Sequence, residues 1–401
     1  MEREKKRYMI LIAATLVNFV HGNPYIWTVF QPYVRAEYGL DVAASSQPFT
    51  LIIGTFAVGN ILGGFLQHKR GSRTAIFIGS ALMCSGFLLA AMAPIHMPFF
   101  ISIGYGILGG VGSGCAFSVL VAVPQAWFPD KRGLVTGITI GIVGVSGVIM
   151  NPLCDVLLAR YGFRISMLVV TAFYALLSFT GLWFVIEPSQ KSELPVSEER
   201  IVPKHAYTTK EMLHTKTYYI ISISMALAVP AYVLVNPLMK SLGMERGLTN
   251  TAALAGVLIA SVGNILGRFL APWLSDMIGR KKVLLGLYVI AMCSVIGIAF
   301  AEGALFILLI SLESMTYGGF VGVYPVVTSD YFGMKYQGMN FGVVMIGYGL
   351  MSVFCPYLIK MVEKTSYGTD LSFVIAGILC GIGILFTLKI QENKKNEGEV
   401  S

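Results

Sequence analysis

Long apolar runs alternate with short polar segments along almost the whole chain of 401 residues. The hydrocarbon core of a bilayer is about 30 Å thick and an α-helix rises about 1.5 Å per residue, so a run of about 20 residues spans it. The runs lie at 8–30, 47–67, 74–93, 98–122, 133–158, 164–186, 217–239, 251–273, 282–301, 304–327, 338–360 and 370–389. The pattern therefore predicts an all-α membrane protein with twelve transmembrane helices.

One long polar segment, residues 187–216, is rich in charge and proline and separates the first six runs from the last six. We predict an N-terminal six-helix bundle at 1–186, a linker at 187–216, a C-terminal six-helix bundle at 217–389 and a tail at 390–401. Lys and Arg are retained on the cytoplasmic side of a membrane. Most of them fall in the termini, the linker and the loops on the same side, so both termini and the linker are predicted to be cytoplasmic. We expect a multi-pass protein of a prokaryotic inner membrane.

Two helices in equivalent places of the halves carry nearly the same sequence, GNILGGFL at 59–66 and GNILGRFL at 263–270. This identity indicates a duplication that makes the two bundles pseudo-symmetric. The glycines after these helices, Gly71 and Gly279, match at an offset four residues longer than the identity does. The repeat is therefore predicted with a slip of one helical turn.

Composition excludes a water-soluble globule, because 55 % of the residues are hydrophobic and only 12 % are charged. The net charge of +8 comes from short basic clusters between apolar runs, so we expect no binding to nucleic acid. The six cysteines lie within apolar runs without a CxxC pair and are interpreted as packing residues. The run at 8–30 is too long for a cleavable signal and is interpreted as a retained helix. We expect no cofactor, no metal and a monomer.

The segment LSDMIGRKK, residues 274–282, resembles the loop after a half's second helix in the major facilitator superfamily. It departs from the family pattern at Pro272, where the family has glycine, and the first copy of the loop has His68 in place of the aspartate. The resemblance implies the major facilitator fold. It also implies that Asp276 and Arg280 form a gating contact that breaks as the halves rock.

Residues 109–147, which include WFPDKRG at 127–133, resemble the oxalate/formate antiporter group and its monocarboxylate-carrying relatives. Segments 22–30, 317–325 and 339–342 match the same group, so the resemblance covers most of the chain. It implies a secondary transporter of small monocarboxylates such as lactate, pyruvate, formate or acetate, which works by alternating access. An electroneutral carboxylate exchanger is the alternative. No HExxH or GxSxG motif indicates an enzyme.

Arg268 is a charge inside an apolar run, two helical turns or about 12 Å from Asp276. A buried arginine is costly and needs a partner, and guanidinium binds a carboxylate through two parallel hydrogen bonds. Asn264 lies one turn earlier on the same face. The resemblance implies that this pair forms the anion site of the lactate-type relatives. A structural salt bridge to another helix is the alternative.

Other predicted substrate contacts lie at positions where this sequence differs from that of the family it resembles. Oxalate carriers place a lysine where Tyr348 aligns, and one cation suits one carboxylate better than two. Phe117 replaces the relatives' substrate-facing tyrosine, and Cys115 holds a polar position two residues before it, which leaves the acid open. Tyr25 and Tyr317 are predicted to close over the substrate.

Proton coupling requires an ionisable group that responds to burial or to substrate. His21 and Glu313 are the candidates. A histidine hydrogen-bonded at a helix end and a glutamate satisfied by a neighbouring helix are the alternatives. The predicted partners are therefore a small carboxylate, protons and the lipid bilayer.

Overall fold

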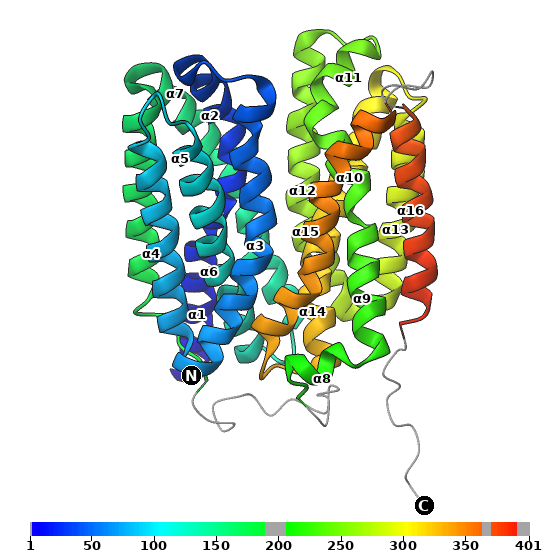
Figure 1. Ribbon diagram of the computed structural model, residues 1–401. Helices are drawn as coiled ribbons and strands as arrows, with labels where there is room; N and C mark the ends of the chain where they lie inside the picture. Colours follow the sequence, from blue (N-terminus) through cyan, green and yellow to red (C-terminus); the bar gives the residue numbers. More distant parts are fainter. Residues whose placement is uncertain (1, 189–205, 363–369, 391–401) are drawn as a thin grey trace, which may run out of the picture.

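The computed structural model of the protein describes residues 2–188, 206–362 and 370–390, and every regular element in these ranges is a helix. The helices form two bundles that stand side by side (Figure 1). They converge at the face where the first helix begins and the last one ends, which is called the terminal face below.

The first bundle is built from the helical elements of the chain's first half. They are α1 (Glu2–Asn18), η1 (Phe19–Gly22), α2 (Asn23–Tyr38), α3 (Val42–Arg70), α4 (Ser72–Ala91), the continuous α5 (Phe99–Ile101), η2 (Ser102–Leu108) and α6 (Gly109–Trp127), and α7 (Arg132–Gly181). The second bundle follows the linker region. Its elements are α8 (Thr209–Leu213), α9 (Lys216–Leu227), α10 (Val229–Val235), η4 (Asn236–Leu238), α11 (Met239–Glu245), α12 (Asn250–Ile278), α13 (Arg280–Ile298), α14 (Gly303–Phe332), α15 (Gln337–Val362) and α16 (Asp370–Leu388).

Eleven stretches of the described residues are long and apolar enough to cross a membrane. One of them, Arg132–Phe179, has 48 residues, which is more than twice the thickness of the hydrocarbon core at the rise of an α-helix. Gly162 interrupts it with φ 70°, a conformation that glycine adopts without strain and that turns the chain back. This stretch therefore supplies two crossings, and the predicted twelve-helix architecture is confirmed. The predicted domain boundaries stay a prediction, since most of the linker and tail lies outside the described residues; α8 lies within the predicted linker.

The first helix of each bundle is broken near its middle, and a proline opens the second piece. Pro24 lies in the first turn of α2 after the 3₁₀ segment η1, and Pro230 lies in the first turn of α10 after Ala228. Proline cannot continue the hydrogen bonding of the preceding turn but fits the start of a helix. Each break is followed closely by a tyrosine, Tyr25 in α2 and Tyr232 in α10, whose positions matter below.

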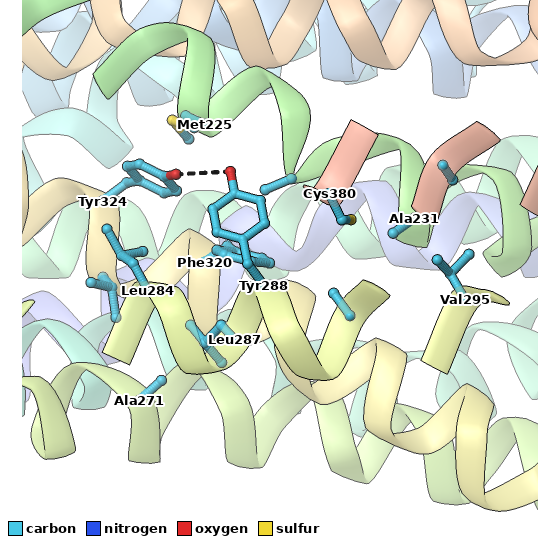
Figure 2. Close-up of a cluster of buried hydrophobic side chains, with 14 of the residues drawn as sticks. Met225, Ala231, Ala271, Leu284, Leu287, Tyr288, Val295, Phe320, Tyr324 and Cys380 are labelled. Carbon is cyan, nitrogen blue, oxygen red and sulfur yellow. Dashed lines mark hydrogen bonds between the residues drawn. The ribbon is translucent and has the colours of Figure 1, made fainter. Parts of the chain in front are cut away.

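Buried side chains fill the interior of both bundles. In the second bundle, Tyr288 and Tyr324 face each other among Met225, Leu284 and Phe320, and their hydroxyls are hydrogen-bonded at 3.2 Å (Figure 2). Ser224 and Thr387 complete this group, with Ser224 Oγ 2.7 Å from the Tyr324 hydroxyl and 2.9 Å from Thr387 Oγ1. The bundle core thus satisfies its own buried hydroxyls.

Candidate functional site

Arg268 lies in α12, ten residues before that helix ends at the terminal face, and its side chain is buried. Its Nε donates a hydrogen bond of 2.8 Å to Asn264 Oδ1, one helical turn earlier. Asn264 Nδ2 in turn donates to the backbone carbonyl of Ser314 in α14 at 3.2 Å. The amide is therefore held from both ends, and it fixes the plane of the guanidinium group.

Tyr25 brings the first bundle to the same guanidinium. Arg268 Nη2 donates to the Tyr25 hydroxyl at 2.5 Å, and the guanidinium carbon lies 5.7 Å from the centre of the tyrosine ring. The hydroxyl hydrogen of Tyr25 stays available for another acceptor, because the oxygen accepts the arginine's bond. The structure thus brings together Arg268, Asn264 and Tyr25, as predicted for the site.

Arg268 has no acidic partner among the residues that the structure describes. Its Nη1 likewise makes no hydrogen bond within that part of the chain. The alternative of a structural salt bridge therefore finds no partner there. An unpaired buried cation is costly, and its Nη1 edge remains ready for an anion.

Three further tyrosines of the second bundle complete the site. The hydroxyls of Tyr317 in α14 and Tyr348 in α15 are 2.5 Å apart. The ring of Tyr232 in α10 stacks on that of Tyr317, with centroids 3.9 Å apart and planes 9° from parallel. All three phenols interact electrostatically with the Arg268 guanidinium. Tyr232 was not predicted; its signal is Pro230, which breaks α9 from α10 as Pro24 breaks the first helix.

Phe117 and Cys115, both of α6, do not face the same surroundings. The buried Phe117 ring packs 5.0 Å from Phe56 and belongs to the apolar cluster against which Tyr25 and Tyr348 also pack. It therefore supplies an apolar wall. Cys115 Sγ donates to the carbonyl of Ala75 in α4 at 3.5 Å, so the thiol faces the interior of the first bundle. The structure does not bring Cys115 to the guanidinium.

His21 and Glu313 are both buried, and neither contacts Arg268. His21 lies in η1, its ring packs edge-on against Phe117 at 6.2 Å, and both ring nitrogens are without a hydrogen-bond partner among the described residues. Glu313 lies in α14, one turn before Tyr317, and its Oε2 is buried without a partner in the same ranges. Each remains a candidate for proton coupling. The groups around each side chain are compared below.

Asp276 connects the two bundles near the terminal face. Its carboxylate accepts hydrogen bonds from the backbone amides of Gly133 at 3.1 Å and Leu134 at 2.9 Å, in the first turn of α7. A carboxylate at this place satisfies amides that lack a partner within the helix and complements the helix dipole. Arg280 Nη2 lies 2.7 Å from Asp276 Oδ1 and fixes the carboxylate.

Asp330, at the end of α14, extends this contact. Arg280 Nε lies 2.9 Å from its Oδ2, and Arg132 Nη1 of the first bundle lies 3.1 Å from its Oδ1. Two carboxylates and two guanidinium groups therefore join α7 to α12 and α14. The predicted gating role of Asp276 and Arg280 stays a prediction, and the sequence did not single out Arg132 or Asp330 for it.

Twelve membrane-crossing helices in two bundles, with a shared polar site between them, define a multi-pass membrane protein of the transporter class. The chain belongs to the Major Facilitator Superfamily, whose sequence profile matches residues 10–356 and 259–401. The family predicted from the loop at 274–282 is thereby confirmed, and the family and fold are those of transporters rather than enzymes.

Several named transporters are similar to this chain in sequence or in fold. The oxalate:formate antiporter of Oxalobacter formigenes is 25 % identical over 92 % of this chain and 88 % of its own length. Monocarboxylate transporter 12 of Mus musculus is 24 % identical over 81 % of this chain and 72 % of its own. Among solved structures, the Escherichia coli fucose:proton symporter FucP superimposes with a TM-score of 0.73 at 13 % identity, over 96 % of this chain and 100 % of that one. This last similarity concerns the fold alone.

Proposed function

We propose that the protein is a secondary transporter of small monocarboxylates of the lactate, pyruvate, formate or acetate class. The observation that carries the proposal is the buried guanidinium of Arg268, which has no acidic partner among the described residues and is oriented by Asn264. Guanidinium offers a planar pair of donors that matches a carboxylate, and a buried cation gains from meeting an anion. The substrate carboxylate completes the ion pair that the chain leaves open.

The neutral groups around Arg268 support a substrate with one negative charge. Tyr317 and Tyr348 donate or accept hydrogen bonds but carry no charge that would balance a second carboxylate. Phe117 and Phe56 offer an apolar surface suited to a short acyl chain. We therefore place monocarboxylates ahead of dicarboxylates such as oxalate.

Both bundles take part, as alternating access requires. Tyr25 from the first bundle contacts Arg268 of the second, and hydrogen bonds from two backbone amides of α7 to Asp276 join the bundles near the terminal face. Rocking of the bundles would separate these groups and open that face. The positions of lysine and arginine support an orientation with that face toward the cytoplasm, in the inner membrane of a prokaryote.

The names of the relatives support carboxylate transport in two modes. One relative is an oxalate:formate antiporter, which favours exchange as a second candidate function; the other is a monocarboxylate transporter. Net uptake driven by a proton gradient indicates symport, whereas counterflow that outpaces net uptake without a pH gradient indicates exchange.

The experiment is uptake of radiolabelled lactate and formate into liposomes that contain the purified protein. We expect Arg268→Lys to abolish saturable uptake, since a lysine cannot form the two parallel bonds. Arg70→Lys, at the exposed end of α3, is the matched control and should transport as the native protein does. Gel filtration establishes that both variants are folded. Unchanged saturable uptake by Arg268→Lys would contradict the proposal.

A further inference from the structure

Glu313 is a carboxyl group that the structure leaves without a counter-ion. Its side chain is 1 % exposed, and its Oε2 has no hydrogen-bond partner among the described residues. No lysine or arginine in those ranges is paired with it. An ionised carboxylate in such a place is strongly disfavoured, so the neutral, protonated form is favoured while the group is buried as it is here.

The elements around α14 bring no cation to Glu313. From α10, Tyr232 interacts with it electrostatically, and so does Cys380 from α16. Both are neutral groups. On α12 the charged side chain inside the apolar run is Arg268, which forms no ion pair with Glu313 among the described residues.

The other helices packed against α14 are α7, α9, α11, α13 and α15. Tyr288 on α13 and Tyr348 on α15 are hydrogen-bonded to Tyr324 and Tyr317 of α14 respectively, and Lys240 and Glu245 on α11 form no ion pair with Glu313 within the described residues. The charged groups of α7 and α13 that approach α14, Arg132 and Arg280, bind Asp330 at the far end of that helix. Within the described residues Glu313 thus has no ion-pair partner.

Tyr232 connects Glu313 to the carboxylate site. It interacts electrostatically with Glu313 and with Arg268, and its ring stacks on Tyr317 beside the guanidinium. A negative charge on Glu313 and a carboxylate bound to Arg268 would therefore repel each other through one layer of aromatic rings, in a medium that screens charge weakly. Binding of the anion favours the protonated form of Glu313, and protonation of Glu313 favours binding of the anion.

His21 lacks such a connection. Its ring nitrogens are also without partners among the described residues, but a neutral imidazole needs no counter-ion, and the ring's contact is the apolar Phe117. It lies in the first bundle, whereas Arg268 and Glu313 both lie in the second.

We propose that Glu313 carries the transported proton: its carboxylate takes up one proton from water on one side of the membrane with each carboxylate that Arg268 binds, and returns it to water on the other side. One anion and one proton then cross together, and no redox partner is required. This inference depends on the proposed function, and it selects symport over exchange.

Lactate is the probe, and the protein is reconstituted in liposomes that enclose a pH-sensitive dye. Two quantities are measured: lactate uptake with proton influx under an inward proton gradient, and lactate counterflow at equal pH. Glu313→Gln mimics the protonated form permanently. We expect it to lose gradient-driven uptake and proton influx to the level of protein-free liposomes while it keeps native counterflow.

Two variants control this result. Glu302→Gln removes an exposed acid that precedes the same helix, and His21→Gln removes the competing candidate. Both should keep coupled uptake and counterflow. Proton influx retained by Glu313→Gln, its loss in His21→Gln, or gradient-driven lactate uptake without proton influx in the native protein would each overturn the inference but leave carboxylate transport standing. Absence of both uptake and counterflow in the native protein would instead refute the proposed function.

If Glu313→Gln does not fold, a carbodiimide tests the native protein directly. The reagent modifies protonated carboxyl groups in apolar surroundings, and mass spectrometry identifies the residue. We expect modification at Glu313 together with loss of proton influx. Loss of influx with modification elsewhere only would overturn the inference.

Discussion

Helices α3 and α12 hold equivalent places in the two bundles, but only α12 carries a charge in its middle. Each has 29 residues, and each ends at a glycine of positive φ, Gly71 at 84° and Gly279 at 100°. Counted from these ends, Arg268 of α12 corresponds to Asn60 of α3. Counted from the shared GNILG sequence, it corresponds to Gly64. The sequence identity is thus displaced by one turn relative to the helix ends.

Close packing is found at the depth set by the helix ends as well as at Gly63, which the sequence identity aligns with Gly267 and whose Cβ would collide with the carbonyl of Cys115. A Cβ on Gly59 would collide with the backbone carbonyl of Val111 in α6, and one on Gly267 would collide with that of Met315 in α14. These two glycines lie at the same distance from the ends of their helices. Close approach of two helix backbones at this depth is therefore common to both bundles.

The side chains at the equivalent position have opposite roles. Asn60 is buried and donates to the carbonyl of Phe56 in its own helix at 2.8 Å. Arg268 reaches out of its helix to Tyr25 of the other bundle. The first bundle therefore has a neutral, local contact at this depth of α3, while the second bundle has there the charge that we propose binds the substrate carboxylate.

Arg268→Asn, which copies Asn60 onto α12, has the largest expected effect. Removing the cation leaves the substrate carboxylate without a partner in a dry site, at a cost of about 2–5 kcal/mol in binding free energy. Lactate affinity measured by calorimetry should fall beyond detection. Asn60→Ala is the control and should leave affinity unchanged; equal losses in the two variants would show that the helices do not differ in this way.

Gly59→Ala and Gly267→Ala test whether the two close contacts are equivalent. Each places a methyl group against backbone that has no flexible end to move, so each should lower stability by about 1–3 kcal/mol. Thermal unfolding in detergent is the measurement. Gly286→Ala in α13 meets no atom within 4 Å and should be neutral or slightly stabilising. A tolerated Gly267→Ala beside a damaging Gly59→Ala would contradict the equivalence.

Sequence patterns predicted much of the difference between α3 and α12, because the strongest sequence signals come from residues within one helix. Apolar runs give the crossings, and the spacing of Asn264 and Arg268 places both on one helical face. Contacts between helices leave weaker signals. Tyr232 was missed because its role depends on stacking against Tyr317 from another helix. The direction of Cys115 could not be predicted either, since a helix position alone does not determine which neighbouring helix the thiol faces.

The loops that follow α3 and α12 differ as well, and Asp276→Asn tests the charged one. The variant keeps the side chain's size but removes the charge that accepts two amides of α7 and pairs with Arg280. Loss of a helix cap costs about 0.5–2 kcal/mol. We expect lower thermal stability, with a deficit relative to the native protein that narrows at high salt, because salt screens the native ion pair. A deficit independent of salt would contradict an electrostatic contact.

His68→Ala addresses the corresponding place in α3 and has the smallest expected effect. His68 holds the aspartate position of the first loop, and its ring packs 4.6 Å from Tyr336, just before α15. This contact joins the bundles by aromatic packing, which contributes about 0.5–1.5 kcal/mol. The variant should therefore lose little stability, and the loss should not change with salt. A salt-dependent loss as large as that of Asp276→Asn would mean that both junctions between the bundles are ionic, and that the asymmetry of α3 and α12 is confined to Arg268.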